Sequence, residues 1–386
     1  MEAKRFDEIR SFYDKEVPEV VQRLLDDPSF CEALKRLFPT IPLVEHADAM
    51  RSCKNIGEFQ RKIIYPVIRT LADKTTAALD LSGFKYLDKS QSYTFITNHR
   101  DIILDSAFLD ILLIEKGLDT FEIAIGDNLL AFPWIKDIVR LNKSFLVKRN
   151  LSVRQQLMAS LELSSYIHHV LHDKNQSIWI AQREGRAKDS DDRTQESVLK
   201  MLNLCGTGSV LENLASIQLV PVSISYEYDP CDYLKAMEMQ LKRDNPSFVK
   251  TRGDDLLNMQ TGLMGFKGRV FYKVTPCISK ELTEMEASGM HKNELFENVA
   301  RLIDHRIHMN YHLYPGNYVA ADMLDGLNQF AHSYSAREKE QFASYLKQQL
   351  DKIDLPNKDE DFLRKRMLEM YANPLKNKKQ ADAVMR

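Results

Sequence analysis

The chain has 386 residues, of which 44% are hydrophobic and 28% are charged, and its formal net charge at pH 7 is −2. This composition is that of a soluble globular protein, and the small net charge excludes the broad basic field of a typical nucleic-acid-binding protein, so no nucleic-acid partner is expected. The five cysteines are scattered and lack metal-ligand spacing, which indicates reduced thiols in the cytosol and no metal site. The N-terminus is charged and no long uninterrupted apolar run follows, so any contact with a membrane is expected to be peripheral.

Residues 1–88 are expected to form a helical N-terminal region. Apolar residues recur there at three- and four-residue spacing, as in Phe6, Ile9 and Phe12. A small helical bundle accounts for this pattern, and the region carries no motif that points to chemistry.

Residues 89–285 are expected to form an α/β domain. Short β-rich runs alternate there with helical stretches, which predicts a mixed, largely parallel sheet covered by helices on both faces. The expected strands span residues 92–97, 121–125, 144–148, 177–182, 218–225 and 268–275. Residues 286–386 return to a helical pattern and are expected to form a C-terminal extension with basic clusters at residues 364–366 and 376–379.

The first candidate site follows the strand at residues 92–97, where Asn98 and His99 precede a helical pattern. Open α/β sheets carry their chemistry at the carboxyl ends of strands, and a histidine that is oriented by a carboxylate can take a proton from an alcohol near neutral pH. The competing interpretation is a structural histidine at a helix cap. The run His99-Arg100-Asp101 also matches the start of a protein-kinase catalytic loop, but Ser106 stands where that loop needs asparagine and no Gly-rich loop precedes it.

Three further blocks follow strands of the predicted sheet. Lys148 and Arg149 end the strand at residues 144–148, and Glu184-Gly185-Arg186 follows the strand at residues 177–182. Arginine suits bidentate contact with a phosphate, and glycine permits a tight turn beside it. The competing interpretations are an exposed strand end with solvated charges for residues 148–149, which is favoured when that block is taken alone, and a charged surface loop for residues 184–186. The fourth block is the apolar strand around Pro221. The acidic run at residues 189–192 lacks the glycine and terminal glutamate of a calcium loop.

Together, and in this order, the four blocks resemble the glycerolipid acyltransferase family, which includes glycerol-3-phosphate and 1-acylglycerol-3-phosphate acyltransferases. The resemblance spans about residues 92–276. It implies that His99 is the general base, that Asp105 orients the imidazole, and that the acceptor binds to five further residues, namely Lys148, Arg149, Glu184, Gly185 and Arg186. Pro221 would shape the floor of the site.

This sequence departs from the family pattern at several points. Residues 100–104 separate His99 from Asp105, which is one residue more than the family has, so a loop must bring Asp105 back to the imidazole, or Asp101 must replace it. We favour Asp105, because Asp101 is expected to cap the following helix. Arg186 follows Gly185 directly, where the family has a residue between them, and Lys143 stands where the family commonly carries glycine.

The resemblance implies transfer of a fatty acyl group from a thioester to the hydroxyl of 1-acylglycerol-3-phosphate or a related phosphorylated glycerol, in phospholipid biosynthesis. The donor would be acyl-CoA or an acyl carrier protein, and no cofactor is expected. The implied partners are this thioester donor, a glycerophospholipid acceptor and a membrane surface. The alternative function is a catalytically silent peripheral lipid-binding protein that retains the fold, and the altered spacing of His99 and Asp105 supports it.

The expected location is the cytoplasm, at the inner face of the membrane, and it follows mainly from the substrate class. Two segments could contact lipid. The apolar residues around Trp134, at positions 129–135, suit an interfacial element or an ordinary core. The basic C-terminal clusters suit attraction to anionic lipid or a solvated tail.

Overall fold

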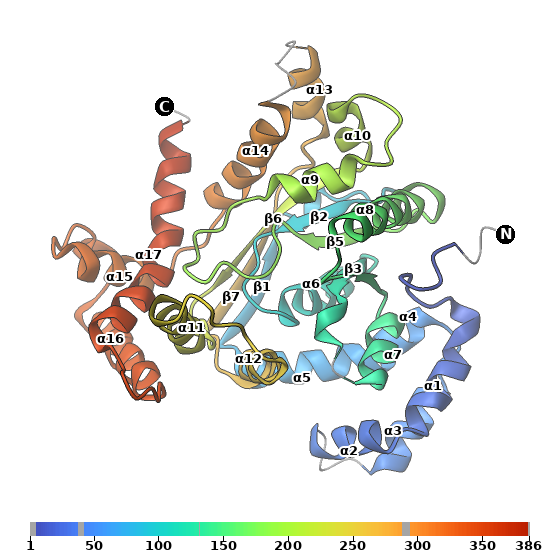
Figure 1. Cartoon of the computed structure of the whole chain (residues 1–386), viewed down its shortest axis with the longest axis horizontal. Helices are drawn as coiled ribbons and strands as arrows, with labels where there is room; N and C mark the ends of the chain where they lie inside the picture. Colours follow the sequence, from blue (N-terminus) through green and yellow to red (C-terminus); the bar gives the residue numbers. More distant parts are fainter. Residues whose placement is uncertain (1–4, 38–41, 131, 288–293, 385–386) are drawn as a thin grey trace.

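The computed structural model of the chain describes residues 5–37, 42–130, 132–287 and 294–384. Its centre is a seven-stranded sheet with the strand order β1-β7-β6-β2-β5-β3-β4 (Figure 1). All neighbouring strands are parallel except β6 and β7, which are antiparallel. The strands are β1 (Ala78–Ser82), β2 (Thr94–Thr97), β3 (Glu122–Gly126), β4 (Ser144–Val147), β5 (Ile178–Ala181), β6 (Leu219–Tyr226) and β7 (Arg269–Val274). The predicted fold class, a mixed and largely parallel sheet covered by helices, is confirmed.

Each expected strand forms, but the sequence analysis missed the edge strand β1. It lies within the segment predicted to be helical and pairs with β7, in the register Ala78 to Arg269. Leu81 is the one buried residue of β1, and Asp80 is exposed, so the segment has no long apolar run. Its partner lies far along the chain, which local sequence cannot reveal. The sheet therefore begins before residue 89, and the division of the chain at residues 88 and 285 stays a prediction.

Helices precede the sheet, connect its strands and follow it. They are α1 (Val17–Leu25), α2 (Pro28–Leu37), α3 (Leu43–Arg51), α4 (Ile56–Phe59), α5 (Tyr65–Thr75), α6 (Leu104–Glu115), α7 (Pro133–Leu141), α8 (Val153–His168), α9 (Glu196–Asn203), α10 (Val210–Ser216), α11 (Asp232–Asp244), α12 (Arg252–Met264), α13 (Ser279–Ala287), α14 (Leu295–Met309), α15 (Pro315–Asp325), α16 (Ala336–Asp351) and α17 (Glu360–Val384). Among the described residues, no helix has both the length and the apolar character needed to cross a bilayer.

The two faces of the sheet carry separate cores, as the alternation of side chains along a strand requires. On β2, Phe95 packs with α5 and α6, whereas Ile96 packs on the opposite face with α8, α9 and α14. β2 is fully buried and central, and its carboxyl end lies in the middle of the sheet edge. The residues that follow β2 therefore lie near the middle of the sheet edge, between the ends of β6 and β5.

The helical regions at the two ends of the chain have cores of their own. In the N-terminal region, Trp134 packs against Phe30, with their ring centroids 5.6 Å apart, so this tryptophan belongs to a core between α2 and α7. Its neighbour Phe132 remains 46% exposed. In the C-terminal extension, Lys378 of α17 donates hydrogen bonds to the carbonyls of Met309 and Tyr311, at 2.6 and 3.0 Å. These bonds attach α17 to the end of α14, so Lys378 is not part of a solvated tail.

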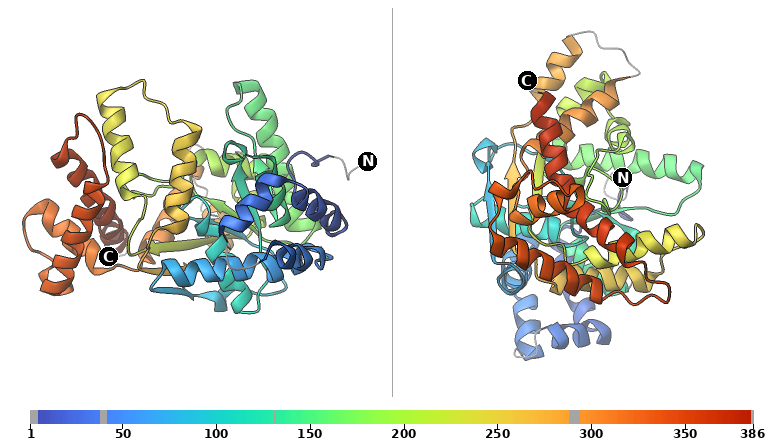
Figure 2. Two further views of the ribbon diagram at one scale, coloured as in Figure 1. Left: turned by 90° about the horizontal axis from the view of Figure 1, so that it is seen from below. Right: turned by 90° about the vertical axis from the view of Figure 1, so that its left-hand side faces the viewer.

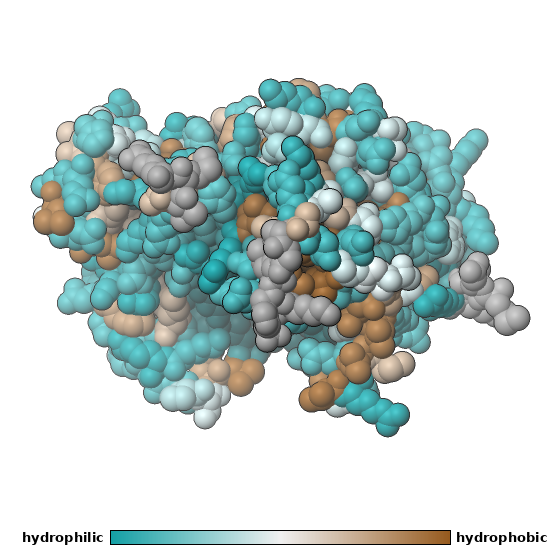
Figure 3. Space-filling view, turned by 90° about the horizontal axis from the view of Figure 1, so that it is seen from above, coloured by the Kyte–Doolittle hydropathy of each residue, from teal (hydrophilic) through white to brown (hydrophobic). Residues whose placement is uncertain are grey.

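Two arms project from one face of the molecule, as both views in Figure 2 show. One arm is α8 with the segment before it, residues 148–168, and the other is the α11–α12 hairpin, residues 232–266. In Figure 3 they form the lower edge of the molecule, and the surface between them is hollowed. Large apolar side chains are exposed on both, at Val153 (86%), Leu157 (56%), Met158 (63%), Val249 (79%), Leu256 (36%), Leu257 (44%), Met264 (59%) and Phe266 (55%).

Candidate active site

The loop between β2 and α6 is anchored by Asn98. The Asn98 amide nitrogen donates to the carbonyl of Ile224, at 2.9 Å, and its amide oxygen accepts from the backbone N–H of the same residue, at 2.8 Å. Asn98 is fully buried, so both bonds are shielded from water. They fix the start of the loop to the neighbouring strand β6 and place His99 at the carboxyl end of the central strand.

His99 and Asp105 are in contact. His99 Nδ1 lies 2.9 Å from Asp105 Oδ2, and the Asp105 side chain is 1% exposed. The same oxygen accepts from the backbone N–H of Arg100, at 2.6 Å, and of Asp101, at 3.0 Å. The loop therefore turns tightly around one carboxylate in the first turn of α6, where the helix dipole favours a negative charge. This turn accommodates the additional residue between His99 and Asp105.

Asp101 has a different place in the loop. Its Oδ1 accepts from the backbone N–H of Ile103, at 2.9 Å, and of Leu104, at 2.8 Å, which caps the start of α6. Burial, and then the negative charge of Asp105, raise the pKa of the Asp101 carboxyl. Of the two acids considered from the sequence, Asp105 is the one that contacts the imidazole.

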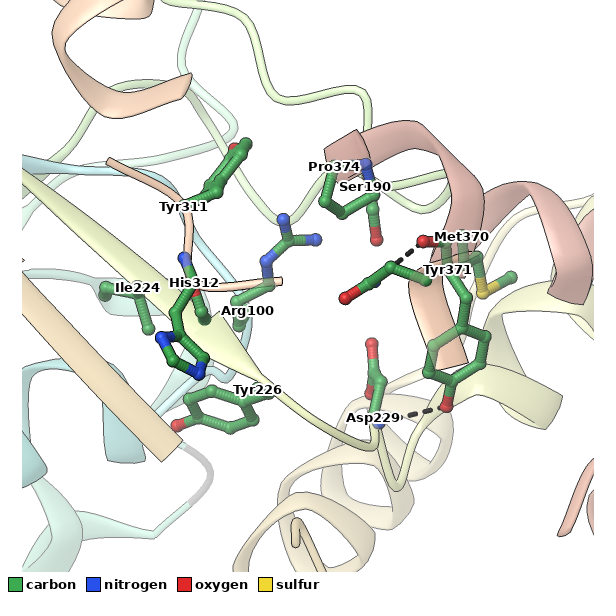
Figure 4. Close-up of a pocket in the computed structure, with 12 residues that line it drawn as sticks. Arg100, Ser190, Ile224, Tyr226, Asp229, Tyr311, His312, Met370, Tyr371 and Pro374 are labelled. Carbon is green, nitrogen blue, oxygen red and sulfur yellow. Dashed lines mark hydrogen bonds between the residues drawn. The ribbon is translucent and has the colours of Figure 1, made fainter. Parts of the chain in front are cut away.

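The back of the loop is fixed by a buried ion pair. Arg100 Nη2 lies 2.8 Å from Asp192 Oδ2, and the two side chains are 6% and 0% exposed. The Tyr311 hydroxyl donates to the same carboxylate at 3.3 Å. Arg100 also lines a cavity of about 30 Å³ that lies beside β6 and α17 (Figure 4). That cavity has room for a water molecule but not for a substrate, so Arg100 serves to hold the loop.

A second cavity of about 630 Å³ opens in front of His99. Every predicted site residue lines it except Asp105, which lies behind the imidazole: the lining includes His99, Lys148, Arg149, Glu184, Gly185 and Arg186. Gly185 has φ +66°, a left-handed conformation in which glycine is favoured, so the turn after β5 has a backbone reason for this residue. One part of the wall is apolar, with Ile125, Leu129, Val147, Leu163, Trp179, Val198 and Met201.

The cations on the β4 side of the cavity already have acidic partners. Arg149 Nη1 lies 2.8 Å from Glu184 Oε1. Lys148 Nζ lies 2.8 Å from a carboxylate oxygen of Glu8 and 3.2 Å from one of Glu162. Glu184 is 67% exposed, so its bond to Arg149 is open to exchange with a ligand.

On the other side, the wall of the cavity is formed by residues that the sequence analysis did not identify. They come from the loop after β5 and from the α11–α12 hairpin: Arg183, Lys188, Lys235, Glu238, Lys242, Lys250, Asp255 and Asn258. Asn258 accepts a hydrogen bond from Arg186 Nη2 at 2.9 Å, which joins the hairpin to the predicted site. The hairpin residues carry no motif, because charged positions on a helix usually face solvent. Arg183 and Lys188 lie on either side of the Glu184-Gly185-Arg186 block and are not part of it.

Lys143, the departure before β4, has a local explanation. It has φ +56°, which is the conformation that a glycine adopts without strain. Its ammonium group donates to Thr120 Oγ1, at 2.8 Å, and to Gln176 Oε1, at 3.1 Å, and it does not line the large cavity. The lysine therefore fills a structural position away from the site.

Comparisons with known proteins agree with the motif order. Residues 79–225 match the family model described as Acyltransferase. Among solved structures, the chain is similar to the 1-acyl-sn-glycerophosphate (LPA) acyltransferase PlsC from Thermotoga maritima, with 13% identity, a TM-score of 0.34, and coverage of 72% of this chain and 95% of that chain. None of the curated proteins compared with the chain matches it. At this TM-score the solved structure says nothing about the function of the chain, so the comparison rests on the family match at residues 79–225.

Proposed function

The chain belongs to the glycerolipid acyltransferase family through its domain at residues 79–225, and we propose that it transfers a fatty acyl group from a thioester to the hydroxyl of 1-acylglycerol-3-phosphate or a related phosphorylated glycerol. The observation that carries this proposal is the contact between His99 Nδ1 and Asp105 Oδ2, 2.9 Å long, at the wall of a cavity of about 630 Å³.

In the proposed reaction His99 is the general base. Asp105 holds Nδ1, which leaves Nε2 to take the proton from the acceptor hydroxyl as its oxygen attacks the thioester carbonyl. The carbon–oxygen bond forms and the carbon–sulfur bond breaks, and the imidazolium returns the proton to the departing thiolate. Asp105 stabilises the imidazolium between these steps. The reaction uses no cofactor.

The acceptor binds on the β4 and β5 side of His99 in this proposal. The phosphate takes the place of the exposed Glu184 carboxylate on Arg149, and Arg186 supplies a second guanidinium from the turn at Gly185. Lys148, which is paired with Glu8 and Glu162, would reach the phosphate only by exchanging one of these carboxylates for it. The acyl chain lies against the apolar part of the wall, formed by β3, β4, α8 and α9.

We place the protein at the cytoplasmic face of a membrane, where phospholipid synthesis would supply the acceptor. The two arms support this placement, because both project from one face of the molecule, on either side of the cavity, and both carry exposed apolar side chains. The α8 arm also carries an exposed cation, Arg154, and residues 150–158 contain no acidic residue. Exposed apolar and basic side chains together favour the interface of an anionic bilayer.

The silent lipid-binding alternative depended on the spacing of His99 and Asp105. The loop accommodates that spacing with the two side chains in contact, so the observation no longer favours the alternative. The test is release of free thiol from acyl-CoA, and separately from an acyl carrier protein, with 1-acylglycerol-3-phosphate or glycerol-3-phosphate as acceptor. Acceptor-dependent release that falls by a factor of about 10² to 10⁴ in His99→Ala is the expected result. Absence of release with every donor and acceptor, from folded protein, would contradict the proposal.

A further inference from the structure

Charge is distributed unevenly around the large cavity. On the β4 side, the positive charges of Lys148 and Arg149 are matched by Glu8, Glu162 and Glu184. On the hairpin side, Lys235 is paired with Asp229. The remaining basic residues on that side outnumber the two acidic ones, Glu238 and Asp255: they are Arg183, Arg186, Lys188, Lys242 and Lys250. The excess positive charge therefore lies beside the α11–α12 hairpin and not at Lys148 and Arg149.

Three ammonium groups share one buried carboxylate in the hairpin. Glu238 is 8% exposed and is paired with Lys188 and with Lys242, whose Nζ lies 3.0 Å from Oε1. Lys250 Nζ is 3.7 Å from Glu238 Oε2 and 3.0 Å from Asp255 Oδ1. Burial and the positive charges of Lys242 and Lys250 lower the pKa of Lys188 to about 7. Lys188 therefore carries only part of its charge near pH 7, and the excess positive charge on this side comes chiefly from Arg183 and Arg186.

The two arginines beside this cluster are not paired with acids. In the part of the chain that the structure describes, neither Arg183 nor Arg186 forms an ion pair, and the buried nitrogens Nε of Arg183 and Nη1 of Arg186 have no hydrogen-bond partner. A buried guanidinium nitrogen without a partner is costly, and an anion in the cavity would relieve that cost. Both arginines line the same cavity as the lysines, so the unpaired donors and the excess charge meet there.

We propose that Lys188, Lys242 and Lys250 form a binding site for an organic phosphate, separate from Lys148 and Arg149. The strand order supports two separate sites, because β6, which leads into the hairpin, and β4, which leads to Arg149, lie on opposite sides of β2 and His99. The role of the bound phosphate as part of a substrate rests on the proposed function, but the binding itself does not. Because the acceptor phosphate is placed on Arg149, the phosphate at this second site belongs to the carrier arm of the thioester donor. A glycerol phosphate bound here would instead move the acceptor away from Arg149.

Binding affinity tests the site without any turnover. Isothermal titration would compare coenzyme A with pantetheine, which lacks phosphate, and glycerol-3-phosphate with glycerol. The variant is Lys242→Gln/Lys250→Gln, and the matched control is Lys365→Gln/Lys376→Gln, two exposed lysines of α17. We expect the variant to weaken binding of a phosphate-bearing ligand by about tenfold or more, and the control to leave it unchanged. If only coenzyme A is affected, the phosphate is the donor's; if only glycerol-3-phosphate is affected, it is the acceptor's.

A second variant separates a ligand site from a structural ion-pair cluster. Glu238→Gln removes the carboxylate that competes for the lysines, so it should strengthen binding of the affected phosphate ligand by severalfold. Thermal unfolding of each variant would confirm that it is folded. Equal affinities of the lysine variant and its control, weaker binding in Glu238→Gln, or no binding of either phosphate ligand to the unmodified protein would overturn the proposal. Since coenzyme A binding needs no catalysis, failure of acyl transfer alone would leave this test intact.

Discussion

Replacement of Asp105 by asparagine removes the negative charge beside His99 and leaves the rest of the loop unchanged. Asparagine has nearly the same shape, and its amide oxygen can still accept from the backbone N–H groups of Arg100 and Asp101. The same oxygen faces His99 Nδ1 and can still accept its proton, so the hydrogen bonds of the loop are kept. What asparagine lacks is the negative charge that stabilises the imidazolium during the reaction.

The size of the effect follows from the geometry of the contact. The imidazolium that forms on His99 lies beside a carboxylate that is 1% exposed. With the charge centres about 4 Å apart and an effective dielectric constant of about 20, the carboxylate stabilises the imidazolium by about 4 kcal/mol. Loss of that interaction in the transition state slows the reaction by about 10³-fold.

The assay is thiol release at saturating substrate concentrations, and the matched control is Asp101→Asn. That change also removes one carboxylate from the loop, but asparagine caps a helix as well as aspartate does, so the bonds from Ile103 and Leu104 are retained. We expect the rate of Asp101→Asn to stay within about tenfold of the unmodified rate. An Asp105→Asn variant as active as Asp101→Asn would refute the assignment of Asp105 as the residue that orients His99.

Three further predictions test the acceptor site, the α8 arm and a buried acid of α11. Arg149→Ala should raise the KM for the glycerol phosphate acceptor by about tenfold, with the KM for the thioester unchanged in the same thiol assay. Leu157→Glu/Met158→Glu should weaken sedimentation with anionic lipid vesicles by about tenfold or more, whereas Leu327→Glu, on an exposed turn, should not; equal loss in both would contradict a role for the arm. Burial, and then the charge of Asp229, raise the pKa of Asp232 to about 7, so this acid binds its proton more tightly when folded, and stability falls as pH rises from about 4 to 7. Asp232→Asn should remove up to about 3 kcal/mol of that loss in urea unfolding between pH 5 and pH 8, and identical pH dependence of variant and unmodified protein would contradict it.

The sequence was sufficient for strands β2 to β7, because they are short apolar runs separated by helical patterns, but not for the edge strand β1. It also marked the residues at the strand ends, and the structure brings His99, Arg149 and Arg186 to one cavity although they lie on three different strand ends. From the sequence, either Asp101 or Asp105 could contact His99. Asp101 caps α6, which leaves Asp105 as the acid that contacts the imidazole.

The hairpin wall of the cavity was not predictable from the sequence. Lys242 and Lys250 lie in a charged segment that has the composition of an ordinary surface helix, and only the fold turns them toward Glu238 and the cavity. The pairing of Arg149 with Glu184 was likewise invisible, because the residues follow different strands and meet only across the sheet edge. Ion pairs between distant segments form only in the tertiary structure. The sequence therefore identifies the basic residues, but it does not show which of them lack an acidic partner.

The most direct test of the central proposal is identification of the lipid product by mass spectrometry. The protein would be incubated with 1-acylglycerol-3-phosphate and either acyl-CoA or an acyl carrier protein that bears the acyl group. We expect a diacylated glycerol phosphate, heavier than the acceptor by one acyl chain, from the unmodified protein and almost none from His99→Ala. An unchanged acceptor with both donors, or equal product from His99→Ala, would contradict the account of His99 as the base of an acyl transfer.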